Sequence, residues 1–404
     1  MNDRLRAGMR EASRLTRAGR LIEATALLQG VLQSGRDRDP AANNRAVPQT
    51  IDLVPDAVEV TAAERGRPES AVRPQVPDAL RRFLDRTTRS RSEPGPGGLA
   101  ELFAADIPVP ESGQFLTKSF SNQAGSRAYK LYVPSQYRGQ PLPLIVMLHG
   151  CTQSPDEFAA GTRMNLRAEE HNCFVAYPEQ SASANISKCW NWFRPGDQIR
   201  GQGEPALIAG LTRQVMSDYS VDEERVYAAG LSAGGAAAAV LAAAYPDLYA
   251  AIGVHSGLAC GAASDVPSAF AAMRRSERGA RRRSDNNLSG RGGYSRIVPA
   301  IVFHGDQDTT VHPTNGDQVI AQLREALVSD ARVEVENGRV PRGRAYTRTV
   351  HRDTADHSVF EQWIIHGAGH AWSGGSPCGS YTDPQGPDAT REMLRFFLEH
   401  PFGS

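Results

Sequence analysis

One serine lies in a sequence pattern that is typical of an enzymatic nucleophile. The pattern is Gly230-Leu231-Ser232-Ala233-Gly234, which follows a run of apolar and small residues from Val226 and precedes an alanine-rich run to Ala243. It predicts a strand, a sharp turn and a helix, with the serine hydroxyl exposed above the end of a parallel sheet. Glycine on both sides indicates close contact of strand and helix, where side chains would collide. We therefore predict that Ser232 is a nucleophile; the alternative is a glycine-rich turn whose serine has no role.

A serine hydroxyl needs a base that takes its proton and a third group that orients the base. In α/β enzymes of this kind the acid and then the base follow the serine along the chain. Two aspartates lie just beyond a predicted buried strand in FHGDQD, at Asp306 and Asp308. We predict that Asp308 is the acid, because it lies deeper in the loop and can return over the sheet edge. Asp306 is the alternative.

The base is expected in the glycine-rich segment HGAGHAWSGG, residues 366–375. His370 lies in the loop of this segment, and we predict that it takes the proton of the serine. His366 still belongs to the strand end, where a hydrogen bond with backbone is expected. His304 and His312 are weaker alternatives.

The negative oxygen that forms in acyl transfer needs backbone N–H donors. The amide of Ala233, directly after the nucleophile, is expected to supply one of them. The second is expected from Cys151 in His149-Gly150-Cys151, which follows the apolar run Leu142 to Leu148. Only the amide of Cys151 is needed, so its side chain could be a small buried thiol without a role.

Aromatic residues gather near these segments. Trp190 and Trp192 lie in Cys189-Trp190-Asn191-Trp192-Phe193, and Trp372 lies two residues after His370. We predict that the three tryptophans line a subsite for an acyl group or a polymer. The alternative for the first two is a hydrophobic plug beneath a long loop.

Strands and helices alternate in the part of the chain that carries these residues. Predicted strands cover residues 126–133, 142–148, 173–177, 250–255, 297–303 and 358–365, and the first of them alternates like an edge strand. Predicted helices cover residues 205–219 and 389–400 besides the one after Ser232. We predict an α/β fold with a mostly parallel, doubly wound sheet, in which ligands bind at the carboxyl ends of the strands.

The chain divides into three predicted parts. Residues 1–34 show apolar residues at helical spacing and predict a short helical arm. Residues 35–112 are rich in Arg, Asp, Pro, Ser and Glu and predict a disordered linker. Residues 113–404 form the predicted catalytic domain, with a basic segment at 274–293 that we expect to be a solvated loop.

Composition excludes several classes of function. The 45 basic and 45 acidic residues cancel, so nothing global indicates nucleic-acid binding. No apolar run is long enough to span a membrane, and no metal or nucleotide motif occurs, so we expect no metal and no cofactor. The N-terminus lacks the apolar core of a secretory signal, which predicts a cytoplasmic protein.

Four motifs, LHGCTQ, GLSAGG, FHGDQD and GAGHAWSGG, together resemble the polyhydroxybutyrate (PHB) depolymerase family of esterases. The resemblance extends over about Gly113 to Phe402 and implies an α/β-hydrolase fold. It also implies hydrolysis of short-chain polyhydroxyalkanoate esters by Ser232, Asp308 and His370, with an oxyanion amide at Cys151. Related esterases act on acetylated or feruloylated xylan, so a general short-chain carboxylesterase or a xylan-directed esterase is the alternative.

Two further possibilities stay open at this stage. The arm at residues 1–34 could contact a polyhydroxyalkanoate granule, which would make the protein a granule-associated binding protein. Cys151 and Cys189 both flank the predicted site and could form a disulfide that braces the oxyanion loop. A disulfide needs an oxidising compartment, so its presence would imply export from the cytoplasm. Export is the alternative location that the family resemblance leaves open.

Overall fold

The protein is described by a computed structural model that covers residues 113–274, 296–325 and 332–403. The predicted helical arm 1–34, the predicted linker 35–112 and nearly all of the basic segment 274–293 lie outside the described residues.

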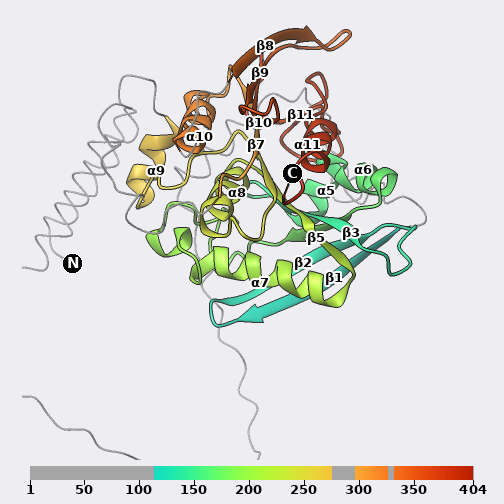
Figure 1. The fold of residues 1–404 in the computed structure, drawn as a ribbon. Helices are drawn as coiled ribbons and strands as arrows, with labels where there is room; N and C mark the ends of the chain where they lie inside the picture. Colours follow the sequence, from blue (N-terminus) through green and yellow to red (C-terminus); the bar gives the residue numbers. More distant parts are fainter. Residues whose placement is uncertain (1–112, 275–295, 326–331, 404) are drawn as a thin grey trace, which may run out of the picture. The chain divides into compact units, whose positions relative to one another are not determined.

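A ten-stranded sheet forms the centre of the catalytic domain, in the order β1-β2-β4-β3-β5-β6-β7-β10-β9-β8 (Figure 1). The six strands from β4 to β10 in this order are parallel, and the outer pairs at both edges are antiparallel. The strands are β1 (Gln114–Asn122), β2 (Gly125–Val133), β3 (Leu142–Leu148), β4 (Phe174–Pro178), β5 (Val221–Leu231), β6 (Ala251–His255), β7 (Ala300–Gly305), β8 (Arg332–Arg339), β9 (Ala345–Arg352) and β10 (Ser358–Ile365). A small separate sheet pairs β11 (Trp372–Ser373) with β12 (Thr382–Asp383).

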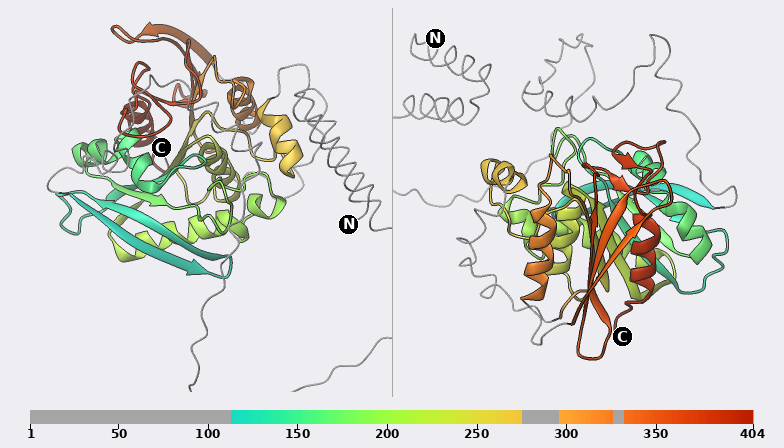
Figure 2. Two further views of the ribbon diagram at one scale, coloured as in Figure 1. Left: turned by 180° about the vertical axis from the view of Figure 1, so that it is seen from behind. Right: turned by 90° about the horizontal axis from the view of Figure 1, so that it is seen from above.

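Helices cover both faces of the sheet, as the view from above shows (Figure 2). One face carries α7 (Gly203–Asp218), α8 (Ala233–Ala244) and α10 (Thr314–Arg324). The other carries α5 (Pro155–Thr162), α6 (Met164–His171) and α11 (Ala389–Leu398). The other helical segments of the described residues are η1 (Pro195–Gln198) and α9 (Val266–Met273).

Alternation along the strands divides the apolar residues between two cores. In β3, Leu144, Val146 and Leu148 point to the α7–α8 side, whereas Ile145 and Met147 point to the α5–α6–α11 side. Because side chains alternate between faces, a strand that is buried on both sides reads as a continuous apolar run. The predicted doubly wound, mostly parallel sheet is therefore confirmed.

The strand predicted at residues 126–133 is confirmed as β2, but its predicted place at the edge of the sheet is wrong. β1 pairs with β2 in antiparallel register from Gln114↔Val133 to Asn122↔Gly125 and takes the edge itself. The sequence of β1 is mostly polar and half exposed, so its own pattern did not reveal it.

The opposite edge is an antiparallel hairpin. β8 is the outermost strand, and Val333 and Val335 on it are exposed between charged neighbours. Charges on an edge strand hinder pairing with another chain. β9 pairs with β10 so that Tyr346 faces Ile365, which places the hairpin turn at the edge where β10 ends.

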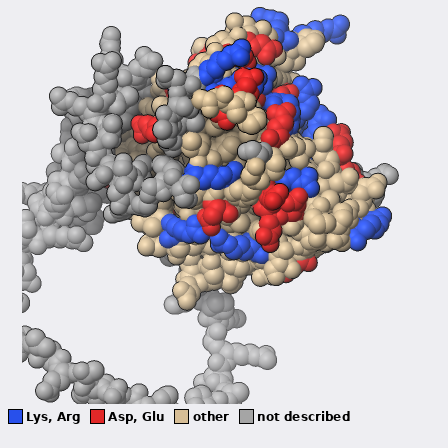
Figure 3. Space-filling view, in the orientation of Figure 1, with Lys and Arg blue, Asp and Glu red and all other residues tan. Residues whose placement is uncertain are grey.

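Basic and acidic side chains lie interspersed on the face drawn in Figure 3. This mixture agrees with the balanced numbers of basic and acidic residues in the sequence. Within the described ranges, no helix is both long enough and apolar enough to cross a membrane.

Candidate active site

Ser232 occupies the sharp turn between β5 and α8. Its backbone angles are φ 59° and ψ −118°, a conformation that is strained for any residue other than glycine. A Cβ on Gly234 would lie 2.0 Å from the Leu148 oxygen, and one on Gly230 would lie 2.3 Å from the carbonyl carbon of Gly234. The two glycines are needed because the turn is packed against the end of β3 as well as against itself.

The position of Ser232 is fixed through its backbone. Its amide donates to the His255 oxygen over 2.8 Å, and its carbonyl accepts from Ala236 at 3.0 Å in α8. The residue is 8% exposed, and among the described residues its hydroxyl makes no hydrogen bond. The backbone therefore holds the hydroxyl in place while the oxygen stays available.

Asp308 lies in the loop after β7 and its carboxylate is buried. Oδ1 accepts from the amides of Thr310 and Val311, both at 2.9 Å, and Oδ2 accepts from His370 Nδ1 at 2.7 Å. Burial alone would raise the pKa of Asp308, but the neighbouring His370 and His304 rings hold it well below its ordinary value. Asp308 is therefore a carboxylate that accepts hydrogen bonds throughout the neutral pH range.

His370 is oriented by that bond. With Nδ1 donating to Asp308, Nε2 carries the lone pair and can accept a proton. The segment before His370 is fixed to the acid loop, since the Gln307 amide donates to the Ala368 oxygen at 2.9 Å. A Cβ on Gly305 would lie 2.3 Å from that same Ala368 oxygen, so the two segments touch.

Strand register explains why these residues from distant parts of the chain share one edge. Leu231 faces His255 in β6, His255 faces Phe303 in β7, and Gly305 faces Ile365 in β10. The carboxyl ends of β5, β7 and β10 are therefore level, and Ser232, Asp308 and His370 each follow one of them. Within the described residues no hydrogen bond joins Ser232 to His370, as is frequent in unliganded enzymes.

Asp306, the alternative acid, has a different partner. Its Oδ2 accepts from His366 Nδ1 at 3.0 Å and its Oδ1 accepts from the Gly367 amide at 2.7 Å. His366 also contacts Thr347 Oγ1 at 3.0 Å. This second Asp–His pair fixes the start of the segment that carries His370 and is partly exposed. The backbone bond expected for His366 is also present, because its amide donates to the Ala345 oxygen at 2.9 Å.

The other two alternative bases are bound elsewhere. His304 is fully buried, with Nε2 against the Val311 oxygen at 2.8 Å and 3.4 Å from Asp308 Oδ2. His312 contacts Thr314 Oγ1 through Nδ1 at 2.9 Å. His304 thus lies behind the acid, where it supports Asp308.

Sequence reasoning missed His255, which lies at the end of β6 between the nucleophile turn and the base segment. Its carbonyl accepts from Ser232, and its Nε2 accepts from the Ser373 amide at 3.0 Å. Burial lowers its pKa to about 3, so the ring stays neutral. The only local signal was its position at the end of a predicted strand.

The amides predicted for the oxyanion site lie next to the nucleophile turn. Ala233 is the first residue of α8, and neither its amide nor that of Cys151 donates to another described residue. A Cβ on Gly150 would lie 3.5 Å from the Leu231 oxygen, which places the Cys151 segment against the residue before Ser232. Both donors are therefore available, and the helix N-terminus adds a favourable dipole.

The Cys151 segment is held on two sides. Cys151 is joined to Cys189 by a disulfide with a Cα–Cα distance of 4.2 Å, so the pairing that the sequence left open is present. Gln153, buried, accepts from the Gly150 amide at 2.8 Å and donates to the Ser380 oxygen at 3.0 Å. Gln153 was part of a recognised motif, but its role in fixing this turn was not predicted.

The structure does not support the predicted subsite of tryptophans. Trp190 and Trp372 are 0% and 1% exposed, so neither ring offers a surface to a substrate. Trp190 Nε1 donates to the His149 oxygen at 3.1 Å, and Trp372 Nε1 donates to Thr390 Oγ1 at 2.9 Å. Trp192, at 6% exposure, also packs in the core. The burial of Trp190 and Trp192 fits the alternative, a hydrophobic plug beneath a long loop.

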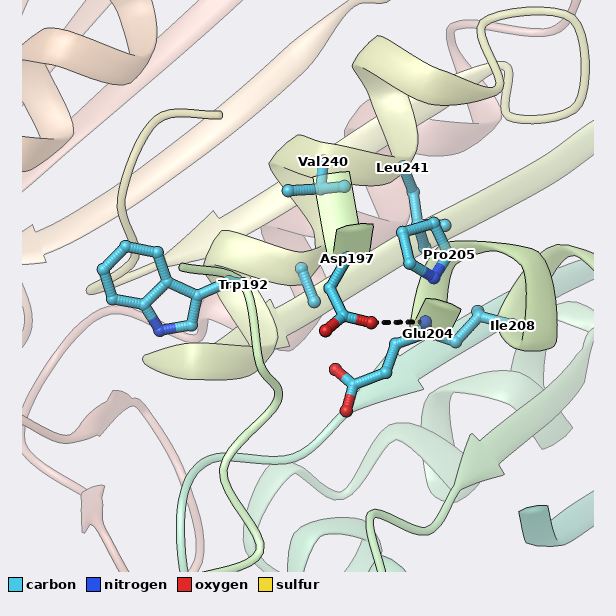
Figure 4. Close-up of a pocket in the computed structure, with 8 residues that line it drawn as sticks. Trp192, Asp197, Glu204, Pro205, Ile208, Val240 and Leu241 are labelled. Carbon is cyan, nitrogen blue, oxygen red and sulfur yellow. Dashed lines mark hydrogen bonds between the residues drawn. The ribbon is translucent and has the colours of Figure 1, made fainter. Parts of the chain in front are cut away.

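Trp192 also lines a small cavity between α7 and α8 (Figure 4). Its volume is about 10 Å³, enough for about one water molecule. An ester substrate does not fit there. Among the described residues, no cluster of three or more His, Cys, Asp or Glu side chains is arranged to hold a metal ion.

Comparisons with known proteins point to one family. The family model described as Esterase PHB depolymerase matches residues 127–338. Poly(3-hydroxyalkanoate) depolymerase C of Paucimonas lemoignei is 32% identical over 295 residues, which cover 69% of this chain and 69% of that protein. Feruloyl esterase B of Thermothelomyces thermophilus is 31% identical over 278 residues, which cover 67% of this chain and 92% of that protein. An acetyl xylan esterase from Aspergillus awamori has a similar fold, with a TM-score of 0.53 and 20% identity over 71% of this chain and 99% of its own.

Proposed function

Because this chain belongs to the Esterase PHB depolymerase family and is a carboxylic ester hydrolase, we propose that it cleaves its substrate through Ser232, His370 and Asp308. The observation that carries the proposal is the 2.7 Å bond from His370 Nδ1 to the buried Asp308 carboxylate, at the sheet edge where Ser232 also lies. This bond gives His370 the tautomer that a general base needs.

The reaction has two halves. In the first, His370 Nε2 takes the proton of Ser232 while Oγ attacks the ester carbon, and the carbonyl oxygen becomes an anion that faces the amides of Cys151 and Ala233. When this intermediate collapses, His370 returns the proton to the leaving alcohol. In the second half, water attacks the acyl-enzyme with His370 again as the base, which releases the acid and restores Ser232.

For the substrate we propose short-chain 3-hydroxyacid polyester or its oligomers. The similarity to a poly(3-hydroxyalkanoate) depolymerase supports this choice. Purified protein should clear a poly(3-hydroxybutyrate) emulsion and release soluble hydroxyacid. Cleavage of p-nitrophenyl butyrate without cleavage of any hydroxybutyrate ester would refute the proposed substrate class, while the proposed mechanism of ester hydrolysis would stand.

A xylan-directed esterase is the second candidate. The match to feruloyl esterase B spans 92% of that protein, so the two share nearly all of its length. Release of acetate or ferulate from substituted xylan, measured beside the polyester assay with the same enzyme preparation, decides between the two substrate classes.

We propose export rather than the cytoplasm as the location. The Cys151–Cys189 disulfide supports it, because disulfides persist mainly in oxidising compartments. Thiol titration in denaturant without reductant, on protein taken from separate cell fractions, tests this: three reactive cysteines indicate the disulfide, since three further cysteines are free in the structure. Five would favour the cytoplasmic location.

Contact of residues 1–34 with a polyhydroxyalkanoate granule stays a proposal. Deletion of these residues should abolish sedimentation with granules and leave hydrolysis of a soluble ester unchanged. Unchanged sedimentation would refute the proposed contact.

A further inference from the structure

A buried carboxylate lies behind the segment that carries Cys151. Glu204, the second residue of α7, is 6% exposed, and its carboxylate contacts three residues outside its helix. Oε2 accepts from the Asn191 amide at 2.6 Å, and Oε1 accepts from Asn191 Nδ2 at 2.6 Å and from Gln180 Nε2. Arg127 Nη2 lies 3.6 Å from Oε1. The amide of Glu204 itself donates to Asp197 at 2.8 Å (Figure 4).

Gln180 and Asn191 are the two ends of one loop, residues 180–191, which follows β4. Glu204 therefore closes this loop at its base by binding both ends. Gln180 Nε2 adds a bond to the Cys189 oxygen at 2.9 Å within the loop. A carboxylate suits this place because it only accepts, and it receives several N–H donors at once.

The same loop is attached to the segment 149–152 at four points. Two of them involve His149, one is a backbone bond and one is covalent. They are Gln180 N to His149 Nε2 at 3.1 Å, Trp190 Nε1 to the His149 oxygen at 3.1 Å, Thr152 N to the Ser187 oxygen at 2.7 Å, and the Cys151–Cys189 disulfide. Movement of the loop thus moves the backbone on both sides of the Cys151 amide.

Glu204 is an ionisable group in a buried place. Burial raises its pKa above 4.5, although the bonds from Asn191 and Gln180 lower it. A buried ionic group is weak evidence for stability and is often replaceable by apolar residues. Because its oxygens are occupied by donors, Glu204 is also unavailable for ester chemistry. The contacts of Glu204 indicate that it acts on the loop 180–191.

We propose that Glu204 is a positioning residue for catalysis, which holds the Cys151 amide in the oxyanion site through the loop 180–191. The proposal rests on the proposed function, in which that amide stabilises the anion. Its contribution belongs to the transition state, since the anion does not exist in the bound ester. A loss of alignment should therefore lower kcat and leave KM nearly unchanged.

The test is Glu204→Gln, an isosteric change that turns an NH₂ group toward the N–H donors of Asn191 or Gln180. Removal of an oxyanion donor costs about 10²–10³ in rate, so we expect a partial loss of roughly 10- to 100-fold in kcat for p-nitrophenyl butyrate. The inhibition constant of butylboronic acid, which forms a tetrahedral adduct on the serine, should rise by the same factor. Rates are normalised to the number of sites titrated by a phosphonate ester, which removes any effect of unfolded protein.

The matched control is Glu361→Gln. Glu361 is also buried and accepts from Arg348 at 2.8 Å and from Arg395 at 2.8 Å, yet it contacts no residue of the segments 149–152 or 180–191. This variant should be less stable to heat and keep its kcat and boronate affinity per titrated site. If Glu204→Gln does not fold, Gln180→Met removes the Gln180 side-chain bonds and keeps its backbone bond to His149.

A second readout does not depend on activity. Hydrogen exchange of a peptide that covers residues 149–153 should be faster in Glu204→Gln or Gln180→Met than in wild type and unchanged in Glu361→Gln. The role of Glu204 would be overturned if the wild-type enzyme is active and both Glu204→Gln and Gln180→Met have the same hydrogen exchange, kcat and boronate affinity as the wild-type enzyme. A wild type that neither hydrolyses esters nor reacts with the phosphonate at Ser232 would instead refute the proposed function.

Discussion

Replacing Asp308 by asparagine changes a single atom type in the centre of the site. Oδ1 accepts from the amides of Thr310 and Val311, so the remaining carbonyl oxygen of the asparagine is retained there. The NH₂ group then faces His370 Nδ1, which can no longer donate. The imidazole must carry its proton on Nε2, where it cannot accept a proton from Ser232.

The expected loss follows from this tautomer change. The corresponding exchange in a serine protease lowers kcat by about 10⁴, which corresponds to roughly 5 kcal/mol of transition-state stabilisation. The fold should survive, because two of the three short bonds to the side chain are kept and the shape is unchanged.

Asp306→Asn is the matched comparison, two residues away on the same loop. Its carboxylate accepts from the Gly367 amide and from His366, and it is about one third exposed. In the variant one acceptor oxygen remains for the Gly367 amide, and water can replace the hydrogen bond that His366 loses. We expect a loss of less than about tenfold, since bonds at such partly exposed sites are worth about 1 kcal/mol.

The assay is kcat/KM on p-nitrophenyl butyrate for both variants, with thermal unfolding and active-site titration to count folded enzyme. The reasoning requires Asp308→Asn to lose far more activity than Asp306→Asn. A reversed ranking would assign the acid to Asp306, and a loss below tenfold in Asp308→Asn would remove the carboxylate from the mechanism.

Three more outcomes are expected. Ser232→Ala should lower turnover by a factor of about 10⁶. Ser232→Gly should be equally inactive and should unfold at a higher temperature than Ser232→Ala, because glycine relieves a backbone strain of about 1–3 kcal/mol; equal melting temperatures of the two variants would argue against strain at the turn. Folding should weaken as pH falls from about 6.5 to about 4, because burial lowers the pKa of His149 from 6.5 to about 4 and that of His255 to about 3, so protons bind the unfolded chain first. Each ring should contribute about 1.4 kcal/mol per pH unit across that window, measured by urea unfolding, and a flat profile would contradict their buried neutral state. Replacing both Cys151 and Cys189 by alanine should cost about 4 kcal/mol of stability for a separation of 38 residues in the chain-entropy treatment, and an unchanged urea midpoint would contradict it.

The parts of the fold that were predictable are those with a local signal. β3 and β10 are seen with the predicted bounds because one is a continuous apolar run and the other a compact run rich in apolar and aromatic residues. The turn at Ser232 was predictable because the steric limits at Gly230 and Gly234 act within five residues. β1 and β8, with mostly polar sequences, become strands through their partners.

The candidate site was predictable where order along the chain implied position. Asp308 and His370 follow strands that the sequence revealed, and the structure brings them into contact. Trp190 and Trp192 were assigned to a subsite because they form an aromatic cluster in a loop, and Trp372 because it lies two residues after His370. Neither signal shows which side of a ring is covered. Glu204 had no local signal and His255 had only its position at the end of a predicted strand, since the roles of both depend on partners far away in the sequence.

The hairpin of β8 and β9 has a consequence for how such an esterase can vary. β7 and β10 pair directly, so the chain leaves Asp308, forms the hairpin at the outer edge, and returns before His370. The hairpin turn lies at the same edge as the base segment, where Arg344 Nη1 donates to the Gly367 oxygen at 2.6 Å. Because β7 and β10 pair with each other directly, changes in this turn need not alter the β7–β10 register. The outer hairpin can thus vary in sequence while the strands that precede Asp308 and His370 keep their positions relative to each other.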